Sequence, residues 1–270
     1  MTHARAYAKL NLALVVGATR PDGKHEVATV MQALELADDI ELEASPRLAV
    51  GGFDADTLVR SALERLAEAA GVTPEWSVQI TKRIPVAAGL GGGSSDAATA
   101  LRLANETLPT PLPARRLHEL AAGLGADVPF FLDRRPALGT GDGSTLAPAD
   151  LPRDYWVLLM LPNRATKAST AAVYKAFDER EGQEGFEERR ARLDEALAGV
   201  RASSDLAFLP RNDLASSPFA DELVRLGAFR ADVTGAGPTV YGLFAERAGA
   251  VRAGESLRSA GQVWLTIPTW

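Results

Sequence analysis

A run of glycines and serines in the first half of the chain has the composition of an anion-binding loop. Residues 85–98 read PVAAGLGGGSSDAA, between a segment that alternates as a strand, 76–80, and an alanine-rich segment of helical spacing. Glycines allow several backbone N–H groups to face one anion, and the N-terminus of a following helix adds positive potential at the same point. The run therefore predicts a phosphate-binding loop; the alternative is a glycine-rich turn that serves only close packing.

The spacing within this run argues against three other kinds of glycine loop. A Walker A loop ends in Gly-Lys-Ser/Thr, whereas the single Gly-Lys pair of the chain, Gly23 and Lys24, precedes His25. A dinucleotide-binding fingerprint needs a third glycine at position 94, where this chain has a serine. It also needs an acidic residue about 20 positions further on, and none lies there, near the proline-rich stretch. A nucleophile elbow needs a glycine two residues after its serine, which neither Ser94 nor Ser95 has. Hydride transfer to a nicotinamide and esterase chemistry are therefore disfavoured.

An aspartate and a lysine elsewhere in the chain are candidates for chemistry on a hydroxyl group. Asp127 follows a predicted helix end and precedes an apolar run, in the stretch GADVPFF at 125–131. Beside a phosphate loop, such a carboxylate can accept the proton of a hydroxyl that attacks phosphorus. Lys9 shares a face of a predicted strand with Asn11, and its ammonium would keep a nearby carboxylate ionised. The alternatives are an aspartate that caps a helix and a lysine on a solvated strand rim.

A second glycine turn and a histidine extend this set. Residues 234–240 read TGAGPTV and lead into a predicted strand, which alone would indicate a hairpin turn. His25 follows a predicted turn at 21–23 and stands beside an extended segment, where its ring could hydrogen-bond the edge of a heterocycle. The alternative for this residue is a surface histidine. Neither feature identifies a function by itself.

Composition limits the chemistry that the chain can perform. The 270 residues are 46% hydrophobic and 24% charged, and 29 Lys and Arg against 35 Asp and Glu give a formal net charge of -6. This charge argues against a protein that wraps nucleic acid or docks on an anionic membrane. With no cysteine and three histidines, disulfides, thiolate zinc sites and a cysteine nucleophile are excluded, and a histidine-rich metal centre is disfavoured. The longest apolar run, 155–161, is far shorter than a membrane span, so we expect a soluble, cytoplasmic protein.

Periodicity predicts strands and helices in mixed order around these residues. Alternation or apolar runs predict strands at 4–16, 25–36, 40–44, 76–80, 155–161, 240–244 and 263–267. Helical spacing or composition predicts helices at 58–70, 97–108, 117–124 and 177–201. We expect a loop at 139–143, and the helix at 117–124 to end at Gly125, a residue that tolerates the left-handed conformation. The chain is therefore interpreted as an α+β protein with two lobes, 1–149 and 150–270.

Three of these segments together resemble the signature motifs of the GHMP small-molecule kinase family. They are AKLNL at 8–12, the loop at 85–98 and the turn at 234–240, which follow the family's order and approximate spacing. The segments PDGKHE at 21–26 and LGADVPFF at 124–131 are similar to members that act on a cytidylylated sugar alcohol. The resemblance spans nearly the whole chain. It implies a two-lobed GHMP kinase fold, with an N-terminal lobe like the ribosomal-protein S5 domain and a ferredoxin-like C-terminal lobe.

The resemblance also implies a reaction and the groups that take part in it. The γ-phosphoryl group of ATP, with Mg²⁺, would be transferred to the 2-hydroxyl of cytidylylated methylerythritol. The protein would be a monomer or homodimer and would have no nucleic-acid or membrane partner. By position, Asp127 would be the catalytic base and Lys9 the lysine paired with it. The residues implied in ATP binding are Lys82, Pro85, Gly89, Leu90, Gly91, Gly92, Gly93, Ser94 and Ser95, and those implied in substrate binding are Asn11, His25 and Tyr174.

One departure from the family pattern keeps the acceptor open. A tyrosine usually precedes the histidine that reads cytosine, and this chain has Lys24 there. The stack of a base on an aromatic ring is worth roughly 1–3 kcal/mol, so its loss would weaken cytidyl binding. The alternatives are therefore a kinase for another small alcohol, such as homoserine, mevalonate or a sugar, and a non-catalytic nucleotide-binding module.

Overall fold

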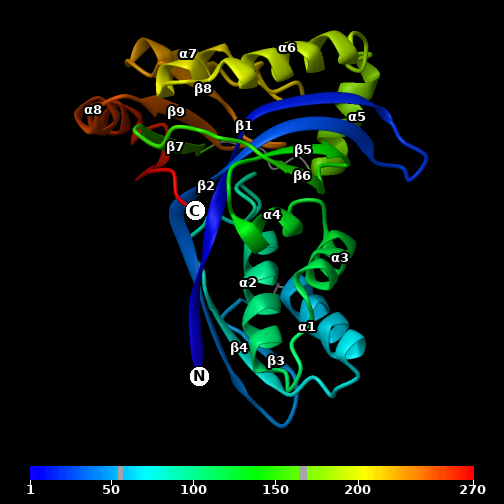
Figure 1. Cartoon of the computed structure of the whole chain (residues 1–270). Coiled ribbons are helices and arrows are strands. Elements are labelled where there is room, and N and C mark those ends of the chain that lie inside the picture. Colours follow the sequence, from blue (N-terminus) through cyan, green and yellow to red (C-terminus); the bar gives the residue numbers. More distant parts are fainter. Residues whose placement is uncertain (54–56, 164–168) are drawn as a thin grey trace. The chain divides into compact units, whose positions relative to one another are not determined.

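The computed structural model describes residues 1–53, 57–163 and 169–270, and Figure 1 labels most of its helices and strands. The chain forms two compact units, each assembled from separate stretches. Unit 1 comprises Met1–Ala8, Leu36–Val86 and Gly91–Arg134, and unit 2 comprises Lys9–Glu35, Ala87–Leu90 and Arg135–Trp270. The lobe boundary expected at 149 and 150 stays a prediction.

Two long strands at the start of the chain contribute residues to both units. They are β1 (Thr2–Thr19) and β2 (His25–Ala44), which pair with each other. The strand predicted at 4–16 is confirmed, and the extended segments predicted at 25–36 and 40–44 are parts of one continuous strand. The predicted turn at 21–23 joins the two strands, and Gly23 has a φ of 81° there. Glycine suits this position because a Cβ disfavours positive φ.

Unit 1 combines a small sheet with helices around an aliphatic core. β4 (Trp76–Thr81) pairs antiparallel with the end of β2 and parallel with β3 (Ala49–Gly51). The helices are α1 (Thr57–Ala70), α2 (Gly92–Thr107), α3 (Ala114–Leu124) and α4 (Val128–Asp133). α1 packs against α2, and Leu63, Leu66 and Leu101 are buried. The three helices predicted in this part of the chain are confirmed, but α2 begins at Gly92, inside the glycine run.

Unit 2 contains an antiparallel sheet of four strands in the order β10-β7-β9-β8. The strands are β7 (Trp156–Pro162), β8 (Arg230–Val233), β9 (Val240–Phe244) and β10 (Gly261–Thr266). α7 (Pro218–Arg225) and α8 (Arg247–Leu257) contribute Leu223 and Leu257 to the core of this sheet. β5 (Ala137–Gly141) pairs with β2. The remaining elements are β6 (Thr145–Pro148), α5 (Thr170–Glu179), α6 (Phe186–Gly199) and the 3-10 helix η1 (Ser203–Phe208).

Two local predictions are wrong, each for a reason that lies in the backbone. The helix predicted at 177–201 is interrupted between α5 and α6, where Gly185 has a φ of 66°. The loop predicted at 139–143 starts later, because residues 139–141 pair with β2 as part of β5. The helix end predicted at Gly125 is confirmed, and this glycine is extended, with a φ of 171°. Strand pairing at 139–141 depends on β2, so local residue type alone could not reveal it.

Candidate active site

Lys9 and Asn11 are neighbours on one face of β1, and both are buried, with 3% and 5% of their surface exposed. Lys9 Nζ donates a hydrogen bond to Asn11 Oδ1 at 2.6 Å, and Asn11 Nδ2 donates to Thr29 Oγ1 at 2.8 Å. Burying a charge is costly unless polar partners replace water. The interpretation of Lys9 as a solvated rim residue is therefore wrong, because its ammonium is enclosed and hydrogen-bonded.

The glycine turn before β9 packs against the first part of the glycine loop. Thr234 Oγ1 accepts a hydrogen bond from the Asn11 N–H at 3.0 Å and donates one to the Gly89 carbonyl at 3.3 Å. Gly89 has a φ of 81°, and a Cβ there would lie 2.4 Å from the Thr234 carbonyl oxygen. The Lys9 N–H donates to the carbonyl of the next loop residue, Leu90, at 3.0 Å. Within unit 2, the turn at 234–240 thus contacts both the β1 motif, at Asn11, and the start of the glycine loop, at Gly89.

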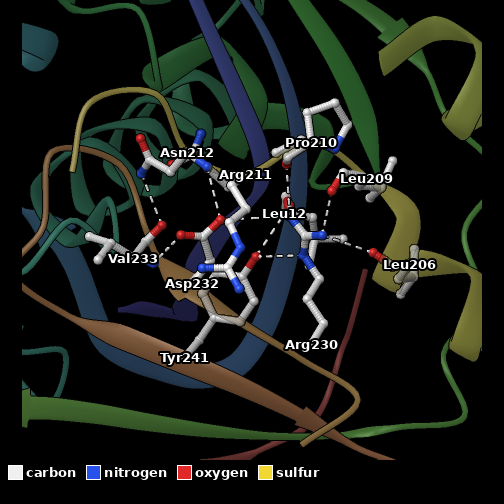
Figure 2. Close-up of polar contacts among 12 residues, drawn as sticks. Leu12, Leu206, Leu209, Pro210, Arg211, Asn212, Arg230, Asp232, Val233 and Tyr241 are labelled. Atoms are coloured by element: carbon white, nitrogen blue, oxygen red, sulfur yellow. Dashed lines mark hydrogen bonds and ion pairs between the residues drawn. The ribbon is translucent and has the colours of Figure 1, made fainter. Parts of the chain in front are cut away.

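A buried arginine anchors β1 at Leu12 (Figure 2), the residue that follows Asn11 in the sequence. Arg230 of β8, 5% exposed, donates from Nη2 to the Leu12 carbonyl at 2.6 Å, and the Tyr241 hydroxyl donates to the same carbonyl at 3.2 Å. Asp232 lies 3.7 Å from the guanidinium and balances its charge. Further carbonyls that accept from this guanidinium belong to Leu206, Ala207, Leu209 and Pro210. Because the guanidinium is a rigid fork of five donors, it holds β1, β8, the end of η1 and the segment after it in one arrangement.

In unit 1, the N-cap residue of α2 is a glycine, which has no side chain to cap the backbone N–H groups of the first turn. Gly91 occupies the N-cap position with a φ of 71°. A Cβ on Gly93 would meet no heavy atom of the described residues within 4 Å, apart from its chain neighbours and its own helix backbone. Ser95 Oγ is buried and has no hydrogen-bond partner among the residues that the structure describes. An uncapped helix N-terminus with open space beside a glycine fits a phosphate group, as the loop prediction requires.

Lys82 and Pro85 lie between β4 and α2, and both are half-buried. Lys82 Nζ pairs with Asp38 Oδ2 at 2.5 Å and with Asp96 Oδ2 at 2.6 Å, and both carboxylate side chains are fully buried. A Cβ on Gly92 would lie 3.3 Å from Lys82 Nζ. The ammonium therefore lies beside the start of α2, and two carboxylates of unit 1 share it.

Asp127 stands between α3 and α4, as expected, and is half-buried. It occupies the N-cap position of α4, yet its side chain makes no capping hydrogen bond to that helix. The interpretation of Asp127 as a helix cap is therefore not supported. Asp127 belongs to unit 1 and Lys9 to unit 2, and their pairing stays a prediction.

His25 and Tyr174 form a second group in unit 2. Their ring centroids are 4.6 Å apart, with 32° between the ring planes, and the His25 Nε2 atom lies 2.7 Å from Asp178 Oδ1. The His25 side chain is 9% exposed, so it is not the surface histidine of the alternative interpretation. Lys24 forms an ion pair with Asp142, in which the Lys24 Nζ atom lies 2.5 Å from Asp142 Oδ2. The Lys24 ammonium and the Ser144 hydroxyl hold the pKa of Asp142 at about 2, although partial burial opposes this.

The described residues contain neither a metal-binding cluster nor a membrane-spanning helix. No group of three or more His, Cys, Asp or Glu in the described ranges has the arrangement to hold a metal ion. No described helix has both the length and the apolar composition needed to cross a membrane.

Sequence reasoning missed several residues that build these groups. Thr29, Arg230 and Asp178 support the predicted residues, but each is a lone polar residue with no motif around it. Asp38 lies in a strand where alternation is interrupted by two adjacent aspartates, which was the available signal. Asp96 lies in the loop motif itself and could have been singled out as an acidic residue in an anion-binding segment.

Comparison with known proteins identifies the family. Residues 57–134 match the GHMP kinases N terminal domain, and residues 215–263 match the GHMP kinases C terminal domain. A protein of Geobacter sulfurreducens named 4-diphosphocytidyl-2-C-methyl-D-erythritol kinase is 40% identical over 94% of this chain and 94% of its own. The chain belongs to the GHMP kinase family. The family resemblance drawn from the motifs is thereby confirmed.

Solved structures agree with the assignment to the GHMP kinases. The crystal structure of a 4-(cytidine 5'-diphospho)-2C-methyl-D-erythritol kinase has a TM-score of 0.80 at 32% identity, covering 100% of both chains. A Methanococcus jannaschii mevalonate kinase has a TM-score of 0.77 at 13% identity, which shows the shared fold alone. The α+β GHMP kinase fold is confirmed, and the chain is a small-molecule kinase that uses ATP.

Proposed function

We propose that this GHMP kinase transfers the γ-phosphoryl group of ATP to the 2-hydroxyl of 4-diphosphocytidyl-2-C-methyl-D-erythritol. The observation that carries the proposal is the 40% identity with a relative of that name across 94% of both chains. A Bacillus pumilus relative with the same name is 37% identical over 88% of this chain and 86% of its own. The site residues described above suit the two ends of this reaction, the nucleotide and the cytidyl alcohol.

The nucleotide end is assigned to the glycine loop. We propose that the backbone N–H groups at the start of α2 bind the triphosphate, with Ser95 Oγ available as a further donor. The remaining residues assigned to ATP are Lys82, Pro85, Gly89, Leu90, Gly91, Gly92, Gly93 and Ser94. Mg²⁺ would arrive with the nucleotide, held by phosphate oxygens and water, because the described residues offer no ready-made cage for it. When bound, the ion neutralises part of the phosphate charge.

The reacting alcohol is assigned to Asp127, Lys9 and Asn11. The hydroxyl oxygen forms a bond to the γ-phosphorus, while the bond from this phosphorus to the oxygen that bridges it to the β-phosphate breaks and ADP leaves. Asp127 takes the hydroxyl proton. Lys9 stabilises the negative charge that develops on the oxygen, and its hydrogen bond to Asn11 fixes the direction of its ammonium.

The cytidyl end is assigned to His25 and Tyr174. A ring that hydrogen-bonds the base edge next to a ring that stacks on its face is a suitable pair for a pyrimidine, and these rings lie 4.6 Å apart between centroids. Lys24 does not provide a second aromatic face, and its ammonium is paired with Asp142. This substitution is the observation that favours the second candidate, a kinase for a small alcohol without a cytidyl group. A cytoplasmic location and a monomeric or homodimeric state stay predictions.

The test is a panel of acceptors offered to the purified protein with Mg-ATP. We expect ADP release with the cytidylylated methylerythritol and none above background with methylerythritol phosphate, homoserine or mevalonate. ADP release with one of the others alone would favour the second candidate. An Asp127→Ala variant should still bind ATP but lose at least about a hundredfold in kcat. ATP binding with no turnover of any acceptor by the unaltered chain would support a non-catalytic nucleotide-binding module and contradict the proposal.

A further inference from the structure

A buried cluster of two carboxylates and one ammonium lies beside the start of α2. Lys82 Nζ is 2.5 Å from Asp38 Oδ2 and 2.6 Å from Asp96 Oδ2. Both carboxylate side chains are 0% exposed, and the lysine side chain is 15% exposed. With all three groups ionised, the cluster would carry one uncompensated negative charge in the interior of unit 1. Such a charge is costly to bury, so a proton on one carboxylate would remove the cost.

The two carboxylates differ in how well they are hydrogen-bonded. Asp38 Oδ1 accepts from the backbone N–H groups of Arg83 at 2.5 Å and Ile84 at 2.8 Å, in addition to the bond from Lys82 to Oδ2. Asp96 accepts a hydrogen bond from Lys82 and otherwise interacts with the Asp38 carboxyl, and its Oδ1 atom is buried with no hydrogen-bond partner among the described residues. Hydrogen-bond donors stabilise the charged form of a carboxylate, so Asp96, which has fewer of them, is the carboxylate that takes the proton.

The direction of the pKa shifts agrees with this geometry. Burial raises the pKa of Asp96 to about 7, the nearby Asp38 carboxylate adds to the rise, and Lys82 opposes it. Burial alone would lower the pKa of Lys82, but the two carboxylates raise it, so the ammonium stays charged. At neutral pH, the Asp96 carboxyl is therefore close to its pKa and can gain or lose a proton.

Among the described residues, the other charged groups on elements packed against α2 are exposed or paired elsewhere. Arg83 and Asp39, which adjoin the cluster in sequence, pair with each other. The charged residues of α1 are all exposed: Arg60, Glu64, Arg65 and Glu68. In α3, Arg115 and Arg116 pair with Glu119, and His118 pairs with Asp133 of α4. On α2 itself, Arg102 pairs with Glu106. Lys82 and Asp38 are thus the groups that set the charge of Asp96.

Asp96 also lies next to the proposed triphosphate position, since α2 begins at Gly92 and Asp96 is in its second turn. Through Lys82 it is tied to Asp38 and so to the backbone of Arg83 and Ile84, which precede the loop. We propose that Asp96 is a positioning residue of the nucleotide site that takes up a proton from solvent when the phosphates of the nucleotide bind at the N-terminus of α2. A bound anion disfavours a second negative charge nearby, and the proton leaves the cluster neutral. The inference rests on the proposed function.

The test is calorimetric titration of the full chain with Mg-ADP at pH 7.5 in two buffers of different ionisation enthalpy. The difference in measured heat gives the number of protons exchanged. For the unaltered protein we expect uptake of up to about 0.7 proton per nucleotide, above that of an isosteric Asp96→Asn variant, whose uptake should be near zero. The matched control is Glu106→Gln, an exposed carboxylate on the same helix, which should behave as the unaltered protein. The KM for ATP should rise severalfold from pH 6.5 to 8.5, but stay nearly constant in Asp96→Asn.

The outcomes separate this inference from the proposed function. Nucleotide binding with the same proton uptake in the unaltered protein and in Asp96→Asn contradicts the inference alone. Absence of nucleotide binding by the folded unaltered protein contradicts both. If Asp96→Asn does not fold, ¹³C NMR of carboxyl-labelled aspartate in the unaltered chain replaces it. One carboxyl resonance should titrate near neutrality and move to higher pH on addition of Mg-ADP, and the absence of such a resonance contradicts the inference.

Discussion

Lys9 Nζ donates a 2.6 Å hydrogen bond to Asn11 Oδ1, and both side chains are buried on the same face of β1. Asn11 is held in turn by Thr29 Oγ1 and, through its backbone N–H, by Thr234 Oγ1. The ammonium is therefore placed before any substrate arrives. Preorganised charge of this kind stabilises a transition state without the cost of reorienting groups during the reaction.

Replacement of this lysine should affect the rate more than the fold. We expect Lys9→Met, which keeps most of the volume, to lower kcat by at least about a hundredfold while the KM for ATP changes less than threefold. Steady-state kinetics with a check of thermal unfolding would measure this. A variant that keeps more than a tenth of the rate would show that the ammonium does not act on the reacting oxygen.

Two glycines of the loop should respond in opposite ways to the same substitution. Gly89→Ala should lower the free energy of unfolding by about 1–3 kcal/mol, because the φ of 81° is strained for alanine and its Cβ would lie 2.4 Å from the Thr234 carbonyl oxygen. Gly93→Ala should leave stability unchanged or raise it by up to about 1 kcal/mol, since its Cβ would meet open space in a helix. Its KM for ATP should still rise at least tenfold, because the phosphate approaches that backbone. A normal KM for Gly93→Ala would contradict the assignment of this helix turn to ATP.

The cytidyl end can be tested on one aromatic residue and its neighbour. Tyr174→Ala should raise the KM for the cytidylylated acceptor by about tenfold to a hundredfold, because a base stack is worth roughly 1–3 kcal/mol, with the KM for ATP unchanged. Lys24→Ala serves as the control and should change the same KM less than threefold, since its partly exposed ion pair with Asp142 contributes little. If Tyr174→Ala and Lys24→Ala raised the KM for the cytidylylated acceptor equally, the cytosine would not stack on Tyr174.

Stability should depend on pH through the buried Asp96. Burial raises the pKa of this carboxyl from 3.8 to about 7, so between these values the folded protein binds a proton that the unfolded chain has lost. The free energy of unfolding, measured relative to Asp96→Asn, should therefore decrease as pH rises from about 4 to about 7 and stay constant above about 8. Urea unfolding at a series of pH values would give this difference. A difference that does not vary with pH would show that Asp96 is already ionised at pH 5.

Much of the fold could be predicted from local pattern, and the rest depends on contacts between distant residues. The alternation at 4–16 and the spacing at 58–70 and 97–108 are local, and the structure confirms them. β5 could not be predicted in full because its glycines pair with β2, far away in the chain. The break between α5 and α6 depends on positive φ at Gly185, which residue type permits but does not require.

The same distinction applies to the site. The glycine loop and Asp127 stand in motifs whose order along the chain is diagnostic. Arg230 has no such signal, because its role arises from carbonyls of Leu12 and Leu209 that only folding brings to it. The burial of Lys9 likewise results from tertiary packing of β1, which periodicity alone does not reveal.

The central claim is tested most directly by identifying the product of the reaction. The purified chain would be incubated with Mg-ATP and 4-diphosphocytidyl-2-C-methyl-D-erythritol, and the mixture followed by ³¹P NMR. We predict a new phosphomonoester resonance on the 2-oxygen of the acceptor, formed together with one equivalent of ADP. ADP formation without that resonance, or an unchanged spectrum in the presence of bound nucleotide, would contradict the proposed reaction.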